Sequence, residues 1–336
     1  MDFGFSEDQE ILRKSARDFL AAECPMTTVR RLMEDEIGFS EDLWRKMAEL
    51  GWIGLVFPEA FGGAGLDMVD LVVVLEEMGR AVMPGPFLST VLLGGLAIAE
   101  GASDEQKKKW LRPVAEGALK VTHAVLEENG KWDESGIQLT ASVDGAGYRL
   151  AGTKLFVPDA HTADLIVVAA RTGKKGGAED LTLFAVEVPS RSVAITQLKT
   201  MDQTRRLCEV VLDQVRVGPE HVIGTVGGAG TLLQRVTDRA KVGLCAEMCG
   251  GAERVLEMSV EYAKVRVQFD KPIGSFQAIQ HKCANMLLQV EAAKSATYYA
   301  AWAVANDVPE APLAAAMAKA YTSDAYRNIA GEGIQI

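Results

Sequence analysis

Residues suited to binding a phosphate group and a flat ring gather between Arg266 and His281. The run RVQF places Arg266, Gln268 and Phe269 within four residues. A guanidinium offers phosphate a planar fork of donors, and an aromatic face offers a stacking surface. Pro272 then breaks the chain before a new helix, whose first N–H groups favour anions. We interpret this stretch as a ligand-binding seam between two helices. The alternative is a helix–turn–helix corner with a solvated arginine.

Helices must hold this seam, and both ends of the chain carry helical patterns. Residues 1–118 place apolar side chains at helical spacing, and the first helix opens on Ser6 in a capping box. From Gly224 the chain is helical again, and it begins with a long run that lacks proline. Such a run is typical of a helical bundle or of a contact between subunits. In its middle, Gly250 and Gly251 predict a packing notch in preference to a ligand contact.

The pattern between residues 119 and 217 differs from that of its flanks. Short runs rich in β-branched residues are separated by Gly, Asp and Pro, and the segment from Asp144 to Gly147 predicts a hairpin turn. The sequence therefore predicts an α+β fold of three domains. They are an N-terminal helical domain (1–118), a central small β-barrel or sandwich (119–217) and a C-terminal helical bundle (218–336).

Composition excludes several classes of function. The chain has 336 residues and a net charge of −11, without a long basic run, so we do not expect a nucleic-acid partner. No apolar stretch is long enough to span a membrane, and the N-terminus lacks a signal-peptide pattern. Five scattered cysteines predict reduced thiols in a cytoplasmic protein. Cys245 and Cys249 share a helix face, but further ligands at useful spacing are lacking, so we expect no metal site.

Other familiar motifs are missing or misplaced. The glycine-rich run from Gly224 to Gly230 follows a β region instead of opening a βαβ unit, so a Rossmann site is rejected. The chain contains no P-loop, no nucleophile elbow and no HExxH helix. The acidic pair Glu76-Glu77 lies on a helix among apolar neighbours, and we expect it to be a solvated edge in preference to an acid/base pair.

Taken in order, these segments resemble the acyl-CoA dehydrogenase family over essentially the whole chain. The stretch RVQFDKPIGSFQAIQHKCANM is the closest match. The opening FGFSEDQEILRKSARDF, the loop and helix FPEAFGGAGLDMVDLVVVLEEMGR, and the β segment GYRLAGTKLFVPDAHTADLIVVAAR are also similar. The ending GEGIQI resembles the start of the family's C-terminal flavin-binding stretch, so we expect the chain to continue beyond Ile336.

The resemblance implies an FAD-dependent oxidoreductase that acts on acyl-CoA in fatty acid or lipid catabolism and passes electrons to an electron-transferring flavoprotein. It implies flavin contacts in the β region at Val125, Leu126 and Phe156. A second set of residues would serve the flavin of a neighbouring subunit: Arg266, Gln268, Phe269, Phe276, Gln277 and Gln335. The protein would then be a homodimer, a homotetramer or a heterotetramer with a related subunit.

The sequence departs from the family pattern where flavin and thioester would bind. Leu126 and Trp132 stand where the family has hydroxyl side chains, and Trp132 would lie beside the substrate thioester. Phe156 replaces a usual Trp, and Pro158 replaces a usual Thr and offers neither a hydroxyl nor an N–H group. Because a neutral hydrogen bond contributes only about 1 kcal/mol, backbone groups of Val125 and Leu126 could still hold the flavin.

The sequence does not identify the catalytic base. One position that the family uses follows Gln335 and lies beyond the chain. The other position holds Ala240, with Lys241 at the place of a usual Arg near the substrate. Asp238 and Glu247 are acids on the same predicted helix and are weak candidates. A packed or surface carboxylate is the alternative for each.

A dehydrogenase is therefore the favoured interpretation. A non-catalytic subunit that lends Arg266 and Gln277 to a partner's flavin is the alternative, and a flavin-dependent oxidase is a third. The atypical β segment favours a branched, cyclic or steroid-derived acyl group over a straight chain.

Overall fold

The computed structural model describes residues 4–173 and 178–336. By its contacts the chain forms two compact units, each assembled from separate stretches. The stretches of the first unit are Met1–Thr28, Asp67–Met83 and Asp238–Ile336, and those of the second are Val29–Leu66 and Pro84–Thr237. The three-domain boundaries that the sequence suggests are not tested by this division and stay a prediction. No helix of the described residues is long and apolar enough to cross a membrane.

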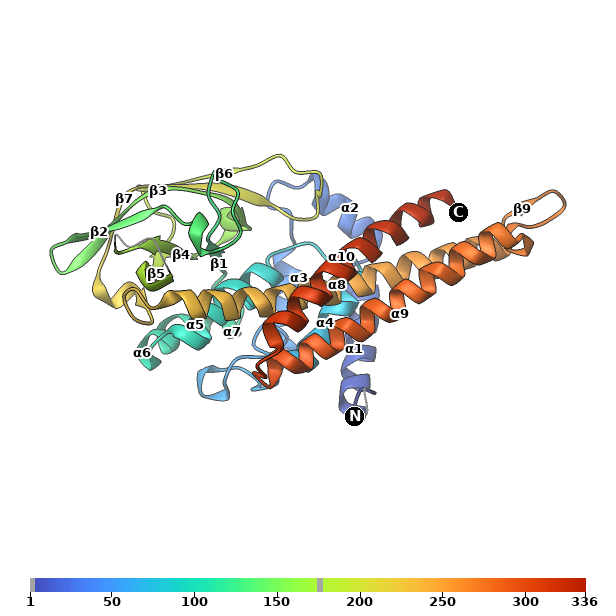
Figure 1. Ribbon diagram of the computed structural model, residues 1–336, viewed down its shortest axis with the longest axis horizontal. Coiled ribbons are helices and arrows are strands. Elements are labelled where there is room, and N and C mark those ends of the chain that lie inside the picture. Colours follow the sequence, from blue (N-terminus) through green and yellow to red (C-terminus); the bar gives the residue numbers. More distant parts are fainter. Residues whose placement is uncertain (1–3, 174–177) are drawn as a thin grey trace. The chain divides into compact units, whose positions relative to one another are not determined.

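The first unit is helical. Its elements are α1 (Glu7–Glu23), α4 (Met68–Arg80), most of α8 (Ala229–Val265), α9 (Gln277–Ala305) and α10 (Ala311–Gln335). Figure 1 shows α8 and α9 as the two arms of a long hairpin, with the short strands β9 (Val267–Gln268) and β10 (Lys271–Pro272) at its tip. The capping box at Ser6 is confirmed, because its hydroxyl accepts from the N–H of Gln9 while the Gln9 side chain accepts from the N–H of Ser6.

Helices α4 and α8 approach closely at one glycine from each helix. A Cβ atom added to Gly79 would lie 2.0 Å from the carbonyl oxygen of Glu247. One added to Gly250 would lie 1.8 Å from the carbonyl oxygen of Glu76. Both distances are below any real Cβ contact, so each backbone occupies the space that a side chain would fill on the other helix. The packing notch expected at Gly250 is thus confirmed.

The second unit contains the β structure and short helices. Its helices are α2 (Met26–Glu34), which begins in the first unit, α3 (Glu41–Glu49), α5 (Leu96–Gly101), α6 (Asp104–Gln106) and α7 (Arg112–Ala115). A π-helical segment, Leu88–Gly95, precedes α5 and is buried apart from Leu93. The run of apolar residues here predicts this burial correctly.

Eight strands form one sheet in the order β6-β7-β3-β2-β4-β5-β8, with β1 paired parallel to β4. The strands are β1 (Val121–Ala124), β2 (Thr140–Asp144), β3 (Gly147–Pro158), β4 (Leu165–Arg171), β5 (Leu181–Glu187), β6 (Val193–Gln197), β7 (Leu207–Val217) and β8 (Val222–Ile223). A single pair, Thr140 with Arg171, joins β2 to β4. Side chains from both halves of the sheet, such as Val210 and Phe184, share one core. The predicted small β-barrel or sandwich is confirmed.

The close approach of α4 and α8 predicts a strong effect of adding one methyl group. Gly250→Ala should lower the free energy of unfolding by about 2 kcal/mol, because two backbones must move apart to admit the side chain. Urea unfolding followed by circular dichroism measures this change. Gly331→Ala on α10 is the matched control, because a Cβ there meets nothing within 4 Å. That variant should be neutral or more stable, and equal losses in both variants would contradict the notch.

A buried histidine in β1 makes the stability depend on pH. His123 is 5% exposed, its Nε2 has no hydrogen-bond partner among the described residues, and burial lowers its pKa from 6.5 to about 3. Below pH 6.5 the unfolded chain binds a proton that the folded chain refuses until about pH 3. Stability therefore falls as the pH drops through this window, by up to about 1.4 kcal/mol per pH unit.

Replacing His123 with Leu should remove this contribution. Urea unfolding between about pH 4 and about pH 7 should then show a shallower loss of stability in the variant than in the wild type, by about one proton. The difference between the two curves isolates His123 from the carboxylates, which titrate in both proteins. Parallel curves would show that His123 is not held neutral.

Candidate functional site

The first part of the site is a bulge in β3. Between Lys154 and Val157 the pairing of β3 with β7 shifts register. In this bulge Phe156 has a φ of 53° and a side chain that is 50% exposed. Positive φ strains a bulky residue, so the surrounding structure must hold it in place. A bulge commonly re-aims a side chain beside a functional site. Here it presents an aromatic ring at the position predicted to contact flavin.

The chain directly after β1 turns two successive carbonyl groups toward β3. The carbonyl of Leu126 accepts from the N–H of Leu155 at 2.9 Å. The carbonyl of Val125 accepts from Nζ of Lys154 at 3.0 Å. Because a trans peptide points its N–H away from its C=O, the N–H groups of Leu126 and Glu127 face away from β3. Two backbone donors therefore point outward where the sequence predicts flavin contacts.

Sequence reasoning missed a buried ion pair beneath these donors. Nζ of Lys154 lies 2.7 Å from a carboxylate oxygen of Glu127, and the lysine side chain is 0% exposed. The carboxylate also accepts from the N–H groups of Gln138 at 2.9 Å and Leu139 at 3.0 Å. Burial lowers the pKa of Lys154 to about 8, and Glu127 opposes that fall. The alternation of β3 could have revealed it, because Lys154 is four residues from the buried Leu150 and shares its face.

Two residues that depart from the family pattern flank this part. Trp132, between β1 and β2, is 82% exposed, so its ring is open to contact. Pro158 is the last residue of β3, and its carbonyl accepts from the hydroxyl of Thr122 at 2.5 Å. This bond ties the end of β3 to β1.

The β9–β10 hairpin is a second, separate candidate site. Gln268 pairs with Lys271, so Phe269 and Asp270 form a two-residue turn with φ angles of 53° and 63°. Such turns favour glycine, asparagine or aspartate, so Asp270 suits its position while Phe269 carries strain. The Phe269 ring is 84% exposed and meets the ring of Phe276 edge-on, with 6.0 Å between centroids. Arg266 and Gln268 are also exposed. The hairpin brings together the residues predicted to bind phosphate and a flat ring.

The two remaining predicted flavin residues lie on neighbouring helices. Gln277 is the first residue of α9 and is exposed. Gln335 is the last residue of α10 and lines a pocket of about 420 Å³ together with polar side chains of both helices. Lys282 and Glu332 form an ion pair in the lining of this pocket.

The candidate bases lie on α8. Asp238 is 4% exposed, and its carboxylate lies 2.8 Å from Nζ of Lys241, the predicted substrate residue. Ala240 between them is 6% exposed. Glu247 is partly exposed, and its carbonyl faces the glycine of α4. Across residues 4–173 and 178–336, no group of three or more His, Cys, Asp or Glu side chains could hold a metal ion.

The expectation of a solvated edge at Glu76-Glu77 is wrong. Both side chains are 2% exposed. Glu76 accepts from the hydroxyl of Tyr298 at 2.6 Å and lies 3.0 Å from Nζ of Lys294. Glu77 forms a bidentate pair with Arg17, at 2.7 and 2.9 Å. The apolar neighbours on α4 were a signal of burial that our interpretation did not use. The cations are 60 or more residues away in the chain, so local sequence did not reveal them.

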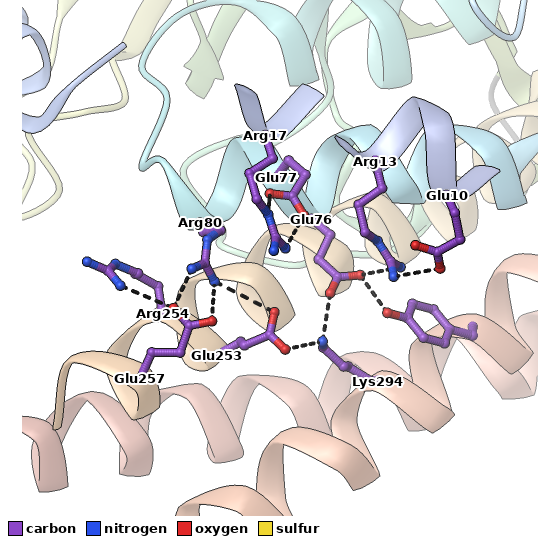
Figure 2. Close-up of polar contacts among 11 residues, drawn as sticks. Glu10, Arg13, Arg17, Glu76, Glu77, Arg80, Glu253, Arg254, Glu257 and Lys294 are labelled. Carbon is purple, nitrogen blue, oxygen red and sulfur yellow. Dashed lines mark hydrogen bonds and ion pairs between the residues drawn. The ribbon is translucent and has the colours of Figure 1, made fainter. Parts of the chain in front are cut away.

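The two glutamates belong to a larger ion-pair cluster, which Figure 2 shows with side chains from α1, α4, α8 and α9. Lys294 also pairs with Glu253 at 2.5 Å, and Arg80 pairs with Glu257. The pairs to Glu76 raise the pKa of Lys294 against the opposing effect of its burial. The cluster therefore fastens α4 to the helices around it and offers no free carboxylate for proton transfer.

Comparison with known proteins covers the whole length of the chain. Three domains of acyl-CoA dehydrogenases match in order: the N-terminal domain at residues 6–118, the middle domain at 122–215 and the C-terminal domain at 228–336. Caffeyl-CoA reductase-Etf complex subunit CarC of Acetobacterium woodii is 31% identical, over 99% of this chain and 88% of that protein.

Solved structures agree with this match. Butyryl-CoA dehydrogenase from Megasphaera elsdenii superposes with a TM-score of 0.92 at 30% identity, over 100% of this chain and 89% of that one. A chain of the ChsE4-ChsE5 complex from Mycobacterium tuberculosis superposes with a TM-score of 0.89 at 29% identity, over 100% of this chain and 87% of that one.

The buried pairs of Glu76 predict a large effect of removing one charge. Glu76→Gln should lower the free energy of unfolding by about 3 kcal/mol, because Lys294 loses a buried partner. Asp18→Asn is the control, since Asp18 is 67% exposed and pairs with Lys14 on the surface of α1. That change should cost about 0.5 kcal/mol or less. Chemical unfolding of both variants measures the difference, and a small loss in Glu76→Gln would argue against the cluster.

Proposed function

The chain belongs to the acyl-CoA dehydrogenase family, and we propose that it converts an acyl-CoA thioester to the trans-2-enoyl-CoA with FAD as cofactor. Members of this family are FAD-dependent oxidoreductases that act on CH–CH bonds. One observation carries the proposal for this chain. Phe156, in the bulge of β3, and Phe269, in the β9–β10 turn that follows Arg266, are both exposed and both have positive φ.

The residues present fit FAD. In the β unit, Phe156 offers a ring face, and the outward N–H groups of Leu126 and Glu127 offer donors to the polar edge of a flavin. On the hairpin, Arg266 offers a guanidinium to the diphosphate, with Gln268, Phe269, Phe276, Gln277 and Gln335 around it. These residues would hold FAD, which would supply the acceptor for a hydride from the β-carbon of the substrate. We propose that the hairpin serves the flavin of a neighbouring subunit, in a homodimer, a homotetramer or a heterotetramer.

The chain's own part in the chemistry is to hold the thioester and take up the α-proton. Hydrogen-bond donors at the thioester oxygen would stabilise the enolate that develops as the proton leaves. A carboxylate within hydrogen-bond reach of the α-carbon must accept that proton. Asp238 and Glu247 are the candidates that we carry forward, with Lys241 and Trp132 beside the substrate. The ion pair with Lys241, at 2.8 Å, occupies the carboxylate of Asp238.

That same ion pair favours a second candidate function. If Lys241 holds Asp238 permanently, the chain would act as a non-catalytic partner that lends Arg266 and Gln277 to a related subunit. Leu126 and Pro158, which lack the family's hydroxyls, favour the same role. The similarity to a chain of the ChsE4-ChsE5 complex supports a heteromeric assembly.

Electron transfer and substrate are further parts of the proposal. Transfer to an electron-transferring flavoprotein is supported by the similarity to a subunit of a reductase-Etf complex. An oxidase is the weaker alternative and would pass electrons to oxygen instead. A branched, cyclic or steroid-derived acyl group and a cytoplasmic location stay predictions from the sequence.

The flavin content per subunit of the purified protein tests the proposal. About one FAD per chain, whose visible absorbance bleaches when acyl-CoA is added without oxygen, would establish the dehydrogenase. FAD that appears only on co-expression with a related subunit would establish the partner role. Rapid recovery of colour in air would identify the oxidase.

Removing the hairpin cation should weaken FAD binding. Arg266→Ala should raise the FAD dissociation constant of the assembled protein by about tenfold to a hundredfold, because a charge-assisted hydrogen bond to phosphate is lost. Lys264→Ala is the control. Lys264 is an exposed cation on the last turn of α8, so its substitution removes the same charge as Arg266→Ala. Titration of the apoprotein with FAD measures both constants. If both variants raise the FAD dissociation constant equally, Arg266 would contribute only its charge and no specific contact.

A further inference from the structure

Lys154, the buried cation of β3, makes a further contact in addition to its ion pair. Lys154 reaches a carboxylate oxygen of Glu127 at 2.7 Å and, with the same nitrogen, the carbonyl of Val125 at 3.0 Å. Its side chain is 0% exposed, so it touches no ligand itself. The carboxylate is fixed in turn by the N–H groups of Gln138 and Leu139. The lysine therefore joins one fixed anion to one backbone carbonyl.

The orientation of the Val125 carbonyl determines the direction of the N–H of Leu126, because both belong to one peptide. In an extended strand, successive carbonyls point to opposite sides, yet those of Val125 and Leu126 both face β3. The N–H of Leu155, freed for this contact by the bulge, holds the second carbonyl. Nζ of Lys154 holds the first and so turns the N–H of Leu126 outward. Because Leu126 has no hydroxyl, the orientation of this peptide is what the residue can offer a ligand.

We propose that Lys154 is a positioning residue of the flavin site, which holds the Val125–Leu126 peptide so that its N–H faces the cofactor. This inference rests on the proposed function, in which that N–H contacts FAD. Glu127 holds the lysine in place, and the lysine in turn holds the Val125–Leu126 peptide. The other charged or titratable groups that act on the ammonium are Arg171 and the neutral His123. Neither replaces its bond to the Val125 carbonyl.

Two variants separate positioning from stability. Lys154→Met removes both contacts but leaves Glu127 as a buried, unpaired carboxylate, which destabilises the protein. The double variant Lys154→Met/Glu127→Gln removes that charge as well, while the Gln side-chain oxygen can still accept a backbone N–H. We therefore expect the double variant to regain most of the lost stability. It should not regain FAD affinity, because nothing holds the Val125 carbonyl.

The FAD dissociation constant of each apoprotein and the hydrogen exchange rate of the Leu126 amide without FAD are the measurements. Both variants should bind FAD about tenfold or more weakly than the wild type. In both variants the Leu126 amide should exchange hydrogen at a rate that differs from that of the wild type. Arg149→Met is the matched control, because Arg149 is also a cation of β3 and pairs with Asp144 at 2.7 Å at the other end of the strand. It should leave both readouts unchanged.

The outcomes distinguish the inference from the function on which it rests. If FAD affinity returns together with stability in the double variant, Lys154 is structural only and the inference is overturned. If the wild type binds FAD and the single variant binds it equally well, the inference is overturned while the proposed function stands. If the wild type binds no FAD, alone or with a related subunit, both are overturned.

Discussion

The buried carboxylates of α4 are the constraint on which the helical unit depends. Glu76 and Glu77 can lose contact with water only if cations reach them, and the partners come from α1 and α9. The glycine notch fixes the same stretch of α4, because the carbonyl of Glu76 lies where a side chain of Gly250 would stand. Close backbone contact and ion pairs therefore determine one arrangement together. A substitution at the glycine notch would disturb the ion pairs, and a substitution of a glutamate would disturb the notch.

Strain is placed where flavin contacts are proposed. Phe156 lies in a bulge, and Phe269 with Asp270 lies in a tight turn, all with positive φ. Each such residue costs on the order of 1 kcal/mol or more, which the paired strands and long helices around it must offset. Both aromatic rings are at least half exposed as a result. A relaxed bulge would point the Phe156 ring elsewhere, and a relaxed turn would do the same to the Phe269 ring, which connects the local cost at each position with its exposed aromatic surface.

The sequence predicts the elements well and the buried charges poorly. The helix start at Ser6, the long α8 and the turn after Asp144 follow from local rules, because caps and turns involve residues three or four apart. The pairing of Glu76 and Glu77 with distant cations has no local signature. The resemblance of the hairpin stretch supplied the proposed flavin residues there, whereas the strain at Phe269 appears only in the backbone angles.

The missing hydroxyl at Leu126 and the contacts that hold its peptide are connected in our proposal. A family hydroxyl at Leu126 would give flavin a side-chain donor whose direction a rotamer sets. Without it, the donor must be a peptide N–H, whose direction only the surrounding backbone can set. At the bulge, the N–H of Leu155 fixes the carbonyl of Leu126, and Nζ of the buried lysine fixes the carbonyl of Val125. Burying a cation is costly, and the cost is reduced by Glu127, itself held by two N–H groups. In our proposal, the fixed geometry of this backbone supplies the flavin with a donor that does not depend on a side chain.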